Sequence, residues 1–262
     1  MEILDITGRA DALDGLPATI GGLCEVAQGL LVHDAAALYL YGDAPAGFVV
    51  SRETKPVAER IDAALTADPA PLTVARPVFA RQVGTCRDFA AMLCAFARHR
   101  GFDARVRCGY ALYLGGERPE DHWVVEYRDG ASGPWRLADA QMDAAHRAAL
   151  GLAFDHADMP RSAFVGGDDA WRLWRGGGAP AERFGHGAHR GERFLFVNLA
   201  RDALARSDAL RSRWDGWRDL GALDRPLSAE ATRAGDALCA GEREALALVA
   251  GGGPDMLAGA RP

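Results

Sequence analysis

Three residues of this sequence have the types and order needed for nucleophilic chemistry on a carbonyl group. Cys86 begins a helix-like segment, His122 begins the strand-like segment His-Trp-Val-Val-Glu-Tyr, and Asp139 ends the strand-like segment Trp-Arg-Leu-Ala-Asp. A thiolate attacks a carbonyl carbon, an imidazole moves the proton, and a carboxylate holds the imidazole in one tautomer. These residues therefore predict cysteine-dependent acyl transfer.

The segment that Cys86 begins has the pattern of an amphipathic helix over residues 86–99. Its apolar side chains recur at helical spacing and predict a helix packed on one side: Phe89, Leu93, Phe96 and Ala97. Thr85 is the predicted N-cap, and Gly101 is the predicted residue after the helix end. Cys86 would then lie in the first turn, where unpaired N–H groups and the helix dipole favour a thiolate.

His122 and Asp139 are expected on neighbouring strands. Alternation over residues 104–112, followed by the segments 122–127 and 135–139, predicts a three-strand antiparallel meander. With the hairpin centred between Gly130 and Ala131, His122 would lie directly opposite Asp139, with Cβ atoms roughly 5 Å apart. A slip of one residue would place the two side chains on opposite faces of the sheet.

The stretch from Arg81 to Asp143 resembles the transglutaminase-like superfamily. The matching motifs are Gly-x-Cys at Gly84 and Cys86, a Gly-Φ-x-Ala-Arg turn over residues 101–105, Gly-Tyr at residues 109–110, His122 before Trp123, and Trp135 four residues before Asp139. His122 departs from the His-x-Trp pattern of the superfamily, because Trp123 follows it directly. The local spellings resemble a bacterial branch rather than the animal cross-linking enzymes.

The resemblance implies a role for each of the three residues. Cys86 matches the nucleophile, His122 the base and Asp139 the third member of a papain-like site. It also implies an α+β fold, with a papain/transglutaminase-like core in which the nucleophile helix packs on an antiparallel sheet and further helices are added at both ends.

One domain is expected over residues 1–262. Its catalytic core would cover about 72–145, with helical additions over 1–71 and 146–250 and a mobile tail over 251–262. The helices predicted outside the core cover residues 18–42, 54–67, 144–153, 168–175, 194–217 and 228–250.

The expected reaction is acyl transfer from an amide or ester through a thioester, on a small-molecule or peptide acyl substrate. Hydrolysis is favoured slightly over transfer to an amine, because water needs no dedicated second site. An amide-forming acyltransferase of small-molecule metabolism and a non-catalytic binding module on the same fold remain alternatives, since the superfamily also holds amide-forming enzymes and inactive members.

Weaker signals surround the three residues. Gln82 lies four residues before Cys86, so its amide could donate to the oxyanion, or it could be a solvated loop residue. Cys86, Cys94, Cys108 and His122 could be imagined around zinc, but they lack the short Cys-x₂₋₄-Cys spacing of structural zinc sites. We therefore predict no metal and no cofactor. The role of the Gly- and His-rich loop 176–191 stays open between a lid, an anion-binding loop and a solvated surface loop.

The composition narrows the class of protein. With 49% hydrophobic residues among 262, the chain can bury a full core, and its net charge of −6 gives no basic footprint for nucleic acid. The five cysteines form no disulfide framework, the N-terminus has no secretory pattern, and no apolar run approaches the roughly 20 residues of a membrane helix. A reduced cytoplasmic protein without nucleic-acid or membrane partners is expected, of unknown oligomeric state.

Overall fold

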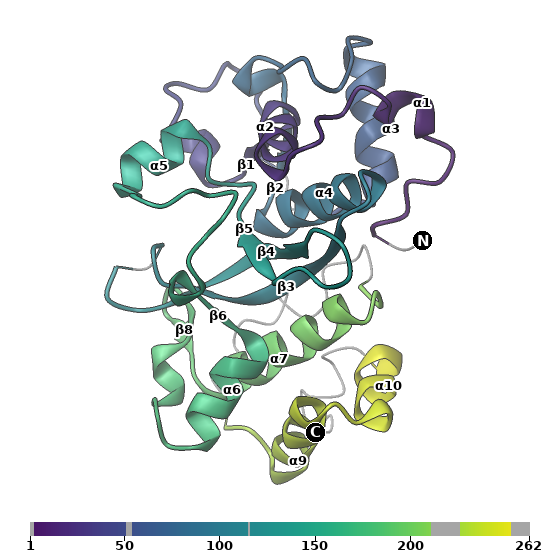
Figure 1. The fold of residues 1–262 in the computed structure, drawn as a ribbon. Helices are drawn as coiled ribbons and strands as arrows, with labels where there is room; N and C mark the ends of the chain where they lie inside the picture. The colour runs from purple at the N-terminus through teal and green to yellow at the C-terminus, as the bar shows by residue number, and fades with distance from the viewer. Residues whose placement is uncertain (1–2, 51–53, 115, 211–225, 253–262) are drawn as a thin grey trace. The chain divides into compact units, whose positions relative to one another are not determined.

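The computed structural model describes residues 3–50, 54–114, 116–210 and 226–252, which divide into two compact units (Figure 1). The described part of unit 1 comprises residues 3–50, 54–106 and 124–160, and that of unit 2 comprises residues 107–114, 116–123, 161–210 and 226–252. Helices and strands are mixed along the chain, which confirms the predicted α+β class. The single domain with a core over residues 72–145 stays a prediction.

Unit 1 contains five helices in its described residues, including the one that begins at Cys86. They are α1 (Ala10–Leu13), α2 (Ile20–Leu30), α3 (Val57–Ala67), α4 (Cys86–His99) and α5 (Ala144–Leu150), with the 3₁₀ turns η1 (Ala36–Leu38) and η2 (Val78–Ala80). Helices α2 and α3 and strand β2 (Gln82–Gly84) pack against α4.

Two of these helices end earlier than predicted. The predicted helix over residues 18–42 ends at Leu30, because the chain continues as β1 (Leu31–His33), which pairs in parallel with β2. Strand pairing in the folded chain therefore outweighs the local helical pattern. The predicted helix 144–153 ends at Leu150, where Gly151 takes the left-handed conformation with φ 61°.

Helix α4 is buried around its whole circumference, which corrects the prediction of a helix packed on one side. Every residue from Arg87 to Ala97 is buried. Three alanines within this span that lie outside the predicted stripe, Ala90, Ala91 and Ala95, are buried as well. The faces that the apolar stripe leaves out are thus covered as well.

The larger sheet has the strand order β6–β3–β4–β7–β8, and β5 also pairs with β4. Its strands are β3 (Asp103–Ala111), β4 (Glu120–Arg128), β5 (Arg136–Ala138), β6 (Phe164–Gly166), β7 (Gly185–His186) and β8 (His189–Arg190). The β4–β5 and β3–β6 pairs are antiparallel, as expected, but β7 joins β4 in parallel. The sheet is therefore mixed and not wholly antiparallel.

Unit 2 is built around α7. This helix (Glu192–Arg206) packs against α6 (Gly167–Arg175), α9 (Ala229–Ala240) and α10 (Arg243–Gly252). The single helix predicted over residues 228–250 is two helices, because Gly241 adopts a left-handed conformation with φ 81° and ends α9. The predicted tail beyond residue 252 lies outside the described residues. So does the part of the predicted helix 194–217 that follows Leu210.

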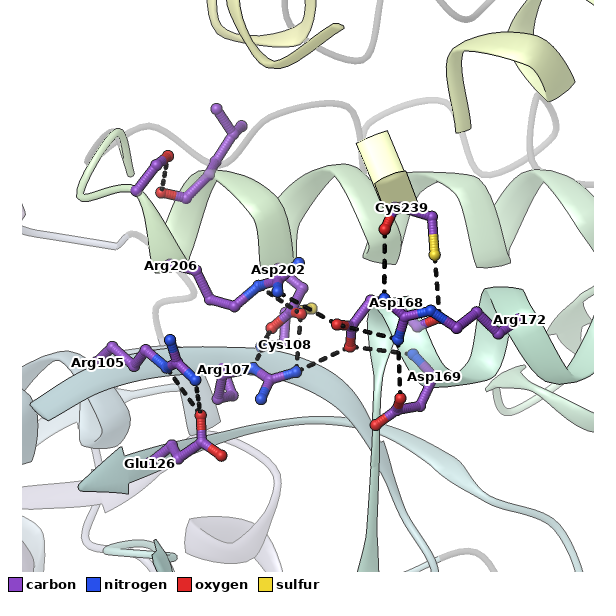
Figure 2. Close-up of polar contacts among 12 residues, drawn as sticks. Arg105, Arg107, Cys108, Glu126, Asp168, Asp169, Arg172, Asp202, Arg206 and Cys239 are labelled. Atoms are coloured by element: carbon purple, nitrogen blue, oxygen red, sulfur yellow. Dashed lines mark hydrogen bonds and ion pairs between the residues drawn. The ribbon is translucent and has the colours of Figure 1, made fainter. Parts of the chain in front are cut away.

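A buried ion-pair network joins β3 to α6 and α7 (Figure 2). Arg107 on β3 donates to Asp202 at 2.8 and 3.0 Å and to Asp168 at 3.0 Å. Asp202 also accepts the backbone N–H of Cys108 at 3.0 Å, and Arg206 pairs with both carboxylates at 3.2 Å. Burial opposes the ionisation of Asp168, but the neighbouring arginines outweigh it and lower its pKa.

Candidate active site

Cys86 is the first residue of α4, as predicted, and it is partly buried. Thr85 is the N-cap with an extended backbone, and the carboxylate of Asp88 accepts the Thr85 N–H at 2.7 Å. At the other end of the helix Gly101 has φ 88°, in the left-handed region that a residue after a helix end favours. The sequence-based placement of the thiol in the first helical turn is confirmed.

Gln82 lies on β2, beside Leu31 of β1. Its amide nitrogen donates to the backbone oxygen of Arg60 at 2.7 Å, so one of its two N–H groups is used within the protein. Its contribution to an oxyanion hole stays a prediction.

Asp139 directly follows β5 and is 1% exposed. Its backbone N–H donates to the carbonyl of His156 at 2.8 Å, and its carboxylate accepts the N–H of Gln141 at 2.9 Å. The backbone position and one carboxylate oxygen are thereby fixed. Such a group can hold a hydrogen-bonded partner in one orientation.

His122 lies on β4 within unit 2 and is 1% exposed. The ring of Tyr113 meets the imidazole edge-on, with the ring centroids 6.0 Å apart. Cys86 and Asp139 belong to unit 1. The triad of Cys86, His122 and Asp139 therefore stays a prediction, whereas the position of each residue along the fold is established.

The register of the β4–β5 hairpin differs from the prediction by two residues. Val125 pairs with Ala138, and Tyr127 pairs with Arg136, so the hairpin is centred between Ala131 and Ser132. The longer turn contains Gly130 with φ 68°. Continued by one residue, this register sets Asp139 opposite Val124 and not opposite His122. Because the shift is even, the predicted face of the strands is unchanged.

A polar cluster that the sequence analysis missed lies in unit 1. The hydroxyl of Tyr41 donates to Asp143 at 2.7 Å, and His146 donates to the same carboxylate through its backbone N–H and its ring Nδ1, both at 2.9 Å. Burial opposes the ionisation of Asp143, but these hydrogen bonds outweigh it and lower its pKa to about 2. The Asp-x-x-His spacing at a helix start was a visible signal, whereas nothing in the sequence pointed to Tyr41.

The Gly- and His-rich loop is an ordered part of the sheet over its last residues. Its strands β7 and β8 form a hairpin, and Glu120 on β4 accepts from Gly187 N–H at 2.6 Å and pairs with His186 and Arg190 at 2.8 and 2.5 Å. Burial opposes the ionisation of Glu120, but these partners outweigh it and lower its pKa. This segment of the loop is therefore held to β4, and its role stays a prediction.

Residues 49–140 match the model of the Transglutaminase-like superfamily. We call these residues, which are similar to that family, the transglutaminase-like segment. The match contains Cys86, His122 and Asp139, and it confirms the resemblance that the local motifs predicted. It supports cysteine-based acyl transfer or hydrolysis as the general class of chemistry. Comparisons with curated proteins and with solved structures gave no match.

Over the described residues, no three His, Cys, Asp or Glu side chains are grouped so that they could hold a metal ion. No helix in the described part of the chain is long and apolar enough to cross a membrane.

Proposed function

We propose that this chain is a cysteine-dependent acyl-transfer enzyme, with Cys86 as nucleophile, His122 as general base and acid, and Asp139 as the group that orients His122. The observation that carries the proposal is the position of Cys86 at the start of α4, behind the Thr85 cap, within the transglutaminase-like segment. At the start of a helix, the positive end of the helix dipole and the backbone N–H groups stabilise a thiolate and the oxyanion that its attack creates.

The reaction would proceed in two steps. The Cys86 thiolate adds to the carbonyl carbon of an amide or ester, and the oxygen takes up the negative charge. The tetrahedral intermediate collapses as His122 gives its proton to the departing amine or alcohol, which leaves a thioester on Cys86. His122 then takes a proton from the acceptor, which attacks the thioester and releases the thiolate. The scheme needs no metal or organic cofactor.

Water is the favoured acceptor, which makes the proposed enzyme a hydrolase of the amidase or peptidase kind. An amine acceptor would give amide exchange or ligation by the same steps. Incubation of a candidate amide with and without a primary amine, read by mass spectrometry, distinguishes the two. Free acid in both reactions supports the hydrolase, whereas an amine adduct with little acid would establish the acyltransferase.

The nucleophile is tested by iodoacetamide at neutral pH, followed by peptide mass spectrometry. We expect Cys86 to be alkylated well before Cys94 and Cys108, which are fully buried. Partly buried Cys239 is the matched control, because burial raises its pKa and it is not part of the proposed site. Labelling of Cys86 no faster than Cys239 would favour a binding module.

A turnover assay completes the test. The Cys86→Ala variant should lose activity entirely and form no trapped thioester, while the Cys239→Ala variant should retain both. Full activity of the Cys86→Ala variant would refute the assignment of the nucleophile.

A further inference from the structure

The first turn of α4 contains a buried carboxylate two residues after Cys86. Asp88 is 1% exposed, and its Oδ2 accepts the Thr85 N–H at 2.7 Å and the Thr85 hydroxyl at 3.1 Å. A Cβ atom at Gly84 would lie only 3.1 Å from the Asp88 Cβ, so the side chain lies directly against the strand that leads to Cys86. A carboxylate here caps the helix, but its charge opposes a thiolate close by.

Arg60, on α3, is the counter-ion of this carboxylate. It is 2% exposed, and its Nη2 and Nε lie 2.8 and 3.2 Å from Asp88 Oδ1. Its Nη1 donates to the carbonyl of Val83 at 3.3 Å, and its own carbonyl accepts the amide of Gln82. One arginine thus contacts both the strand before Cys86 and the helical turn after it. The two helices involved, α3 and α4, are labelled in Figure 1.

The other charges on the elements packed against α4 are placed differently. Glu25 on α2 and Glu59 and Asp62 on α3 are exposed, so solvent screens them from the thiol. Asp62 also pairs with Arg9. On β1, next to β2, His33 lies 3.2 Å from the carboxylate of Asp34.

Further charged groups lie on α4 itself and in the proposed triad. Arg87 follows Cys86 directly and is buried, and His122 and Asp139 are the proposed partners of the thiol. None of these groups is altered by changing Arg60 or Asp88, so they form a constant background in a comparison of variants.

We propose that Arg60 is a positioning residue for the nucleophile: it cancels the charge of Asp88, so that a capping carboxylate can stand two residues from Cys86 without suppressing the thiolate. The inference rests on the proposed function, in which the Cys86 thiolate attacks the acyl carbon. It adds α3 to the elements that serve the site and explains why an arginine is buried there beside the helix start.

The test is the pH dependence of Cys86 alkylation, measured peptide by peptide with iodoacetamide. Arg60→Met should raise the pH midpoint of Cys86 alkylation by about one pH unit, because the Asp88 carboxylate, two residues from Cys86, then lacks its counter-ion. Asp88→Asn should lower the midpoint by a similar amount, because it leaves the guanidinium uncompensated. The double variant should return close to the wild type. A purely structural role would not move the two single variants in opposite directions.

Controls and outcomes keep the inference separate from the proposed function. Glu59→Gln, on the exposed face of the same helix, should leave the midpoint unchanged, and Cys239 is an internal reference in every sample. Arg60→Lys should restore most of the wild-type midpoint. If Arg60→Met does not fold, the difference in midpoint between Asp88→Asn and the double variant still measures the effect of Arg60 on Cys86.

Two results have distinct meanings. Shifts of the same sign in both single variants, or an unchanged midpoint in Asp88→Asn, would overturn the inference about Arg60. A wild-type midpoint at about 8.5, the value of an ordinary thiol, would contradict the proposed function, whatever the variants show.

Discussion

At Tyr41, a single hydroxyl group influences the ionisation of a carboxylate far along the chain. Its hydrogen bond to Asp143 is 2.7 Å long, and the pKa of Asp143 is lowered to about 2 in spite of burial. A folded-state pKa below the ordinary value of 3.8 means that Asp143 stabilises the fold above about pH 4, and that this stabilisation is lost as the pH falls toward 2.

Tyr41→Phe removes this hydrogen bond without removing the ring. We expect the free energy of unfolding at pH 7 to fall by about 1 kcal/mol, because the folded-state pKa of Asp143 moves back toward its ordinary value. The difference from the wild type should shrink between pH 4 and pH 2. Urea unfolding at a series of pH values measures it, with the exposed Tyr39→Phe as control; a difference that grows in acid would contradict the assignment.

At the same scale, the sequence predicted the local setting of Cys86 well. Thr85, Cys86 and Gly101 occupy the predicted positions at the two ends of α4, because caps and helix ends depend on residues close in sequence. Tyr41 and Arg60 could not be found in this way. Their partners lie 102 and 28 residues away, and such pairings are set by the folded chain.

At the scale of elements, β4 and β5 show where reasoning from sequence reached its limit. The strands and their antiparallel pairing were predicted, but the register was wrong by two residues, because turn length decides it and the turn offers two glycines, Gly130 and Gly133. The parallel addition of β7 beside Glu120 had no local signal at all, since it joins segments more than sixty residues apart.

The β7–β8 hairpin should loosen when Glu120 is removed. Glu120→Ala deletes the acceptor of Gly187 N–H and the ion partner of Arg190. We expect trypsin to cleave after Arg183 and Arg190 at least a few-fold faster in this variant, because proteases act on opened segments. Glu182→Ala, an exposed change within the same segment, is the control; equal cleavage rates in both variants would show that Glu120 does not hold the hairpin.

At the junction of β3 with α6 and α7, loss of the buried carboxylate of Asp202 should lower the free energy of unfolding much more than loss of the exposed carboxylate of Asp169. Asp202→Ala leaves Arg107 with one of its two carboxylates and the Cys108 N–H without its acceptor. Loss of one partner from such a buried pair should cost roughly 3 kcal/mol in urea unfolding. Asp169→Ala, whose pair with Arg172 is exposed, should cost little; similar losses in the two variants would contradict a buried network.

At the scale of the whole molecule, the burial of His156 makes the stability of the fold depend on pH in the mildly acidic range. The residue is 8% exposed, and neither ring nitrogen has a hydrogen-bond partner among the described residues. Burial, with a contribution from Arg147, lowers its pKa below the ordinary 6.5. The unfolded chain therefore binds a proton at a higher pH than the folded chain does, and stability falls as the pH drops below about 6.5.

His156→Leu should remove this loss. We expect the variant to lose less stability than the wild type between pH 7 and pH 5, because no proton is taken up on unfolding at this position and no ring hydrogen bond is broken. The backbone carbonyl that accepts Asp139 N–H remains. Thermal unfolding at both pH values measures the effect, with the exposed His99→Leu as control; identical pH dependence in wild type and variant would refute it.

Gly109 on β3 gives the Gly-Tyr motif a purely steric meaning. A Cβ atom there would lie 2.2 Å from the carbonyl oxygen of Val165 and 2.9 Å from the Cα of Gly166. Any larger residue would therefore push β6 away from β3. A descendant that had lost its thiol would need this glycine just as much as an active enzyme does. Retention of Gly-Tyr in a sequence thus indicates strand pairing, and it does not distinguish active enzymes from inactive proteins of the same fold.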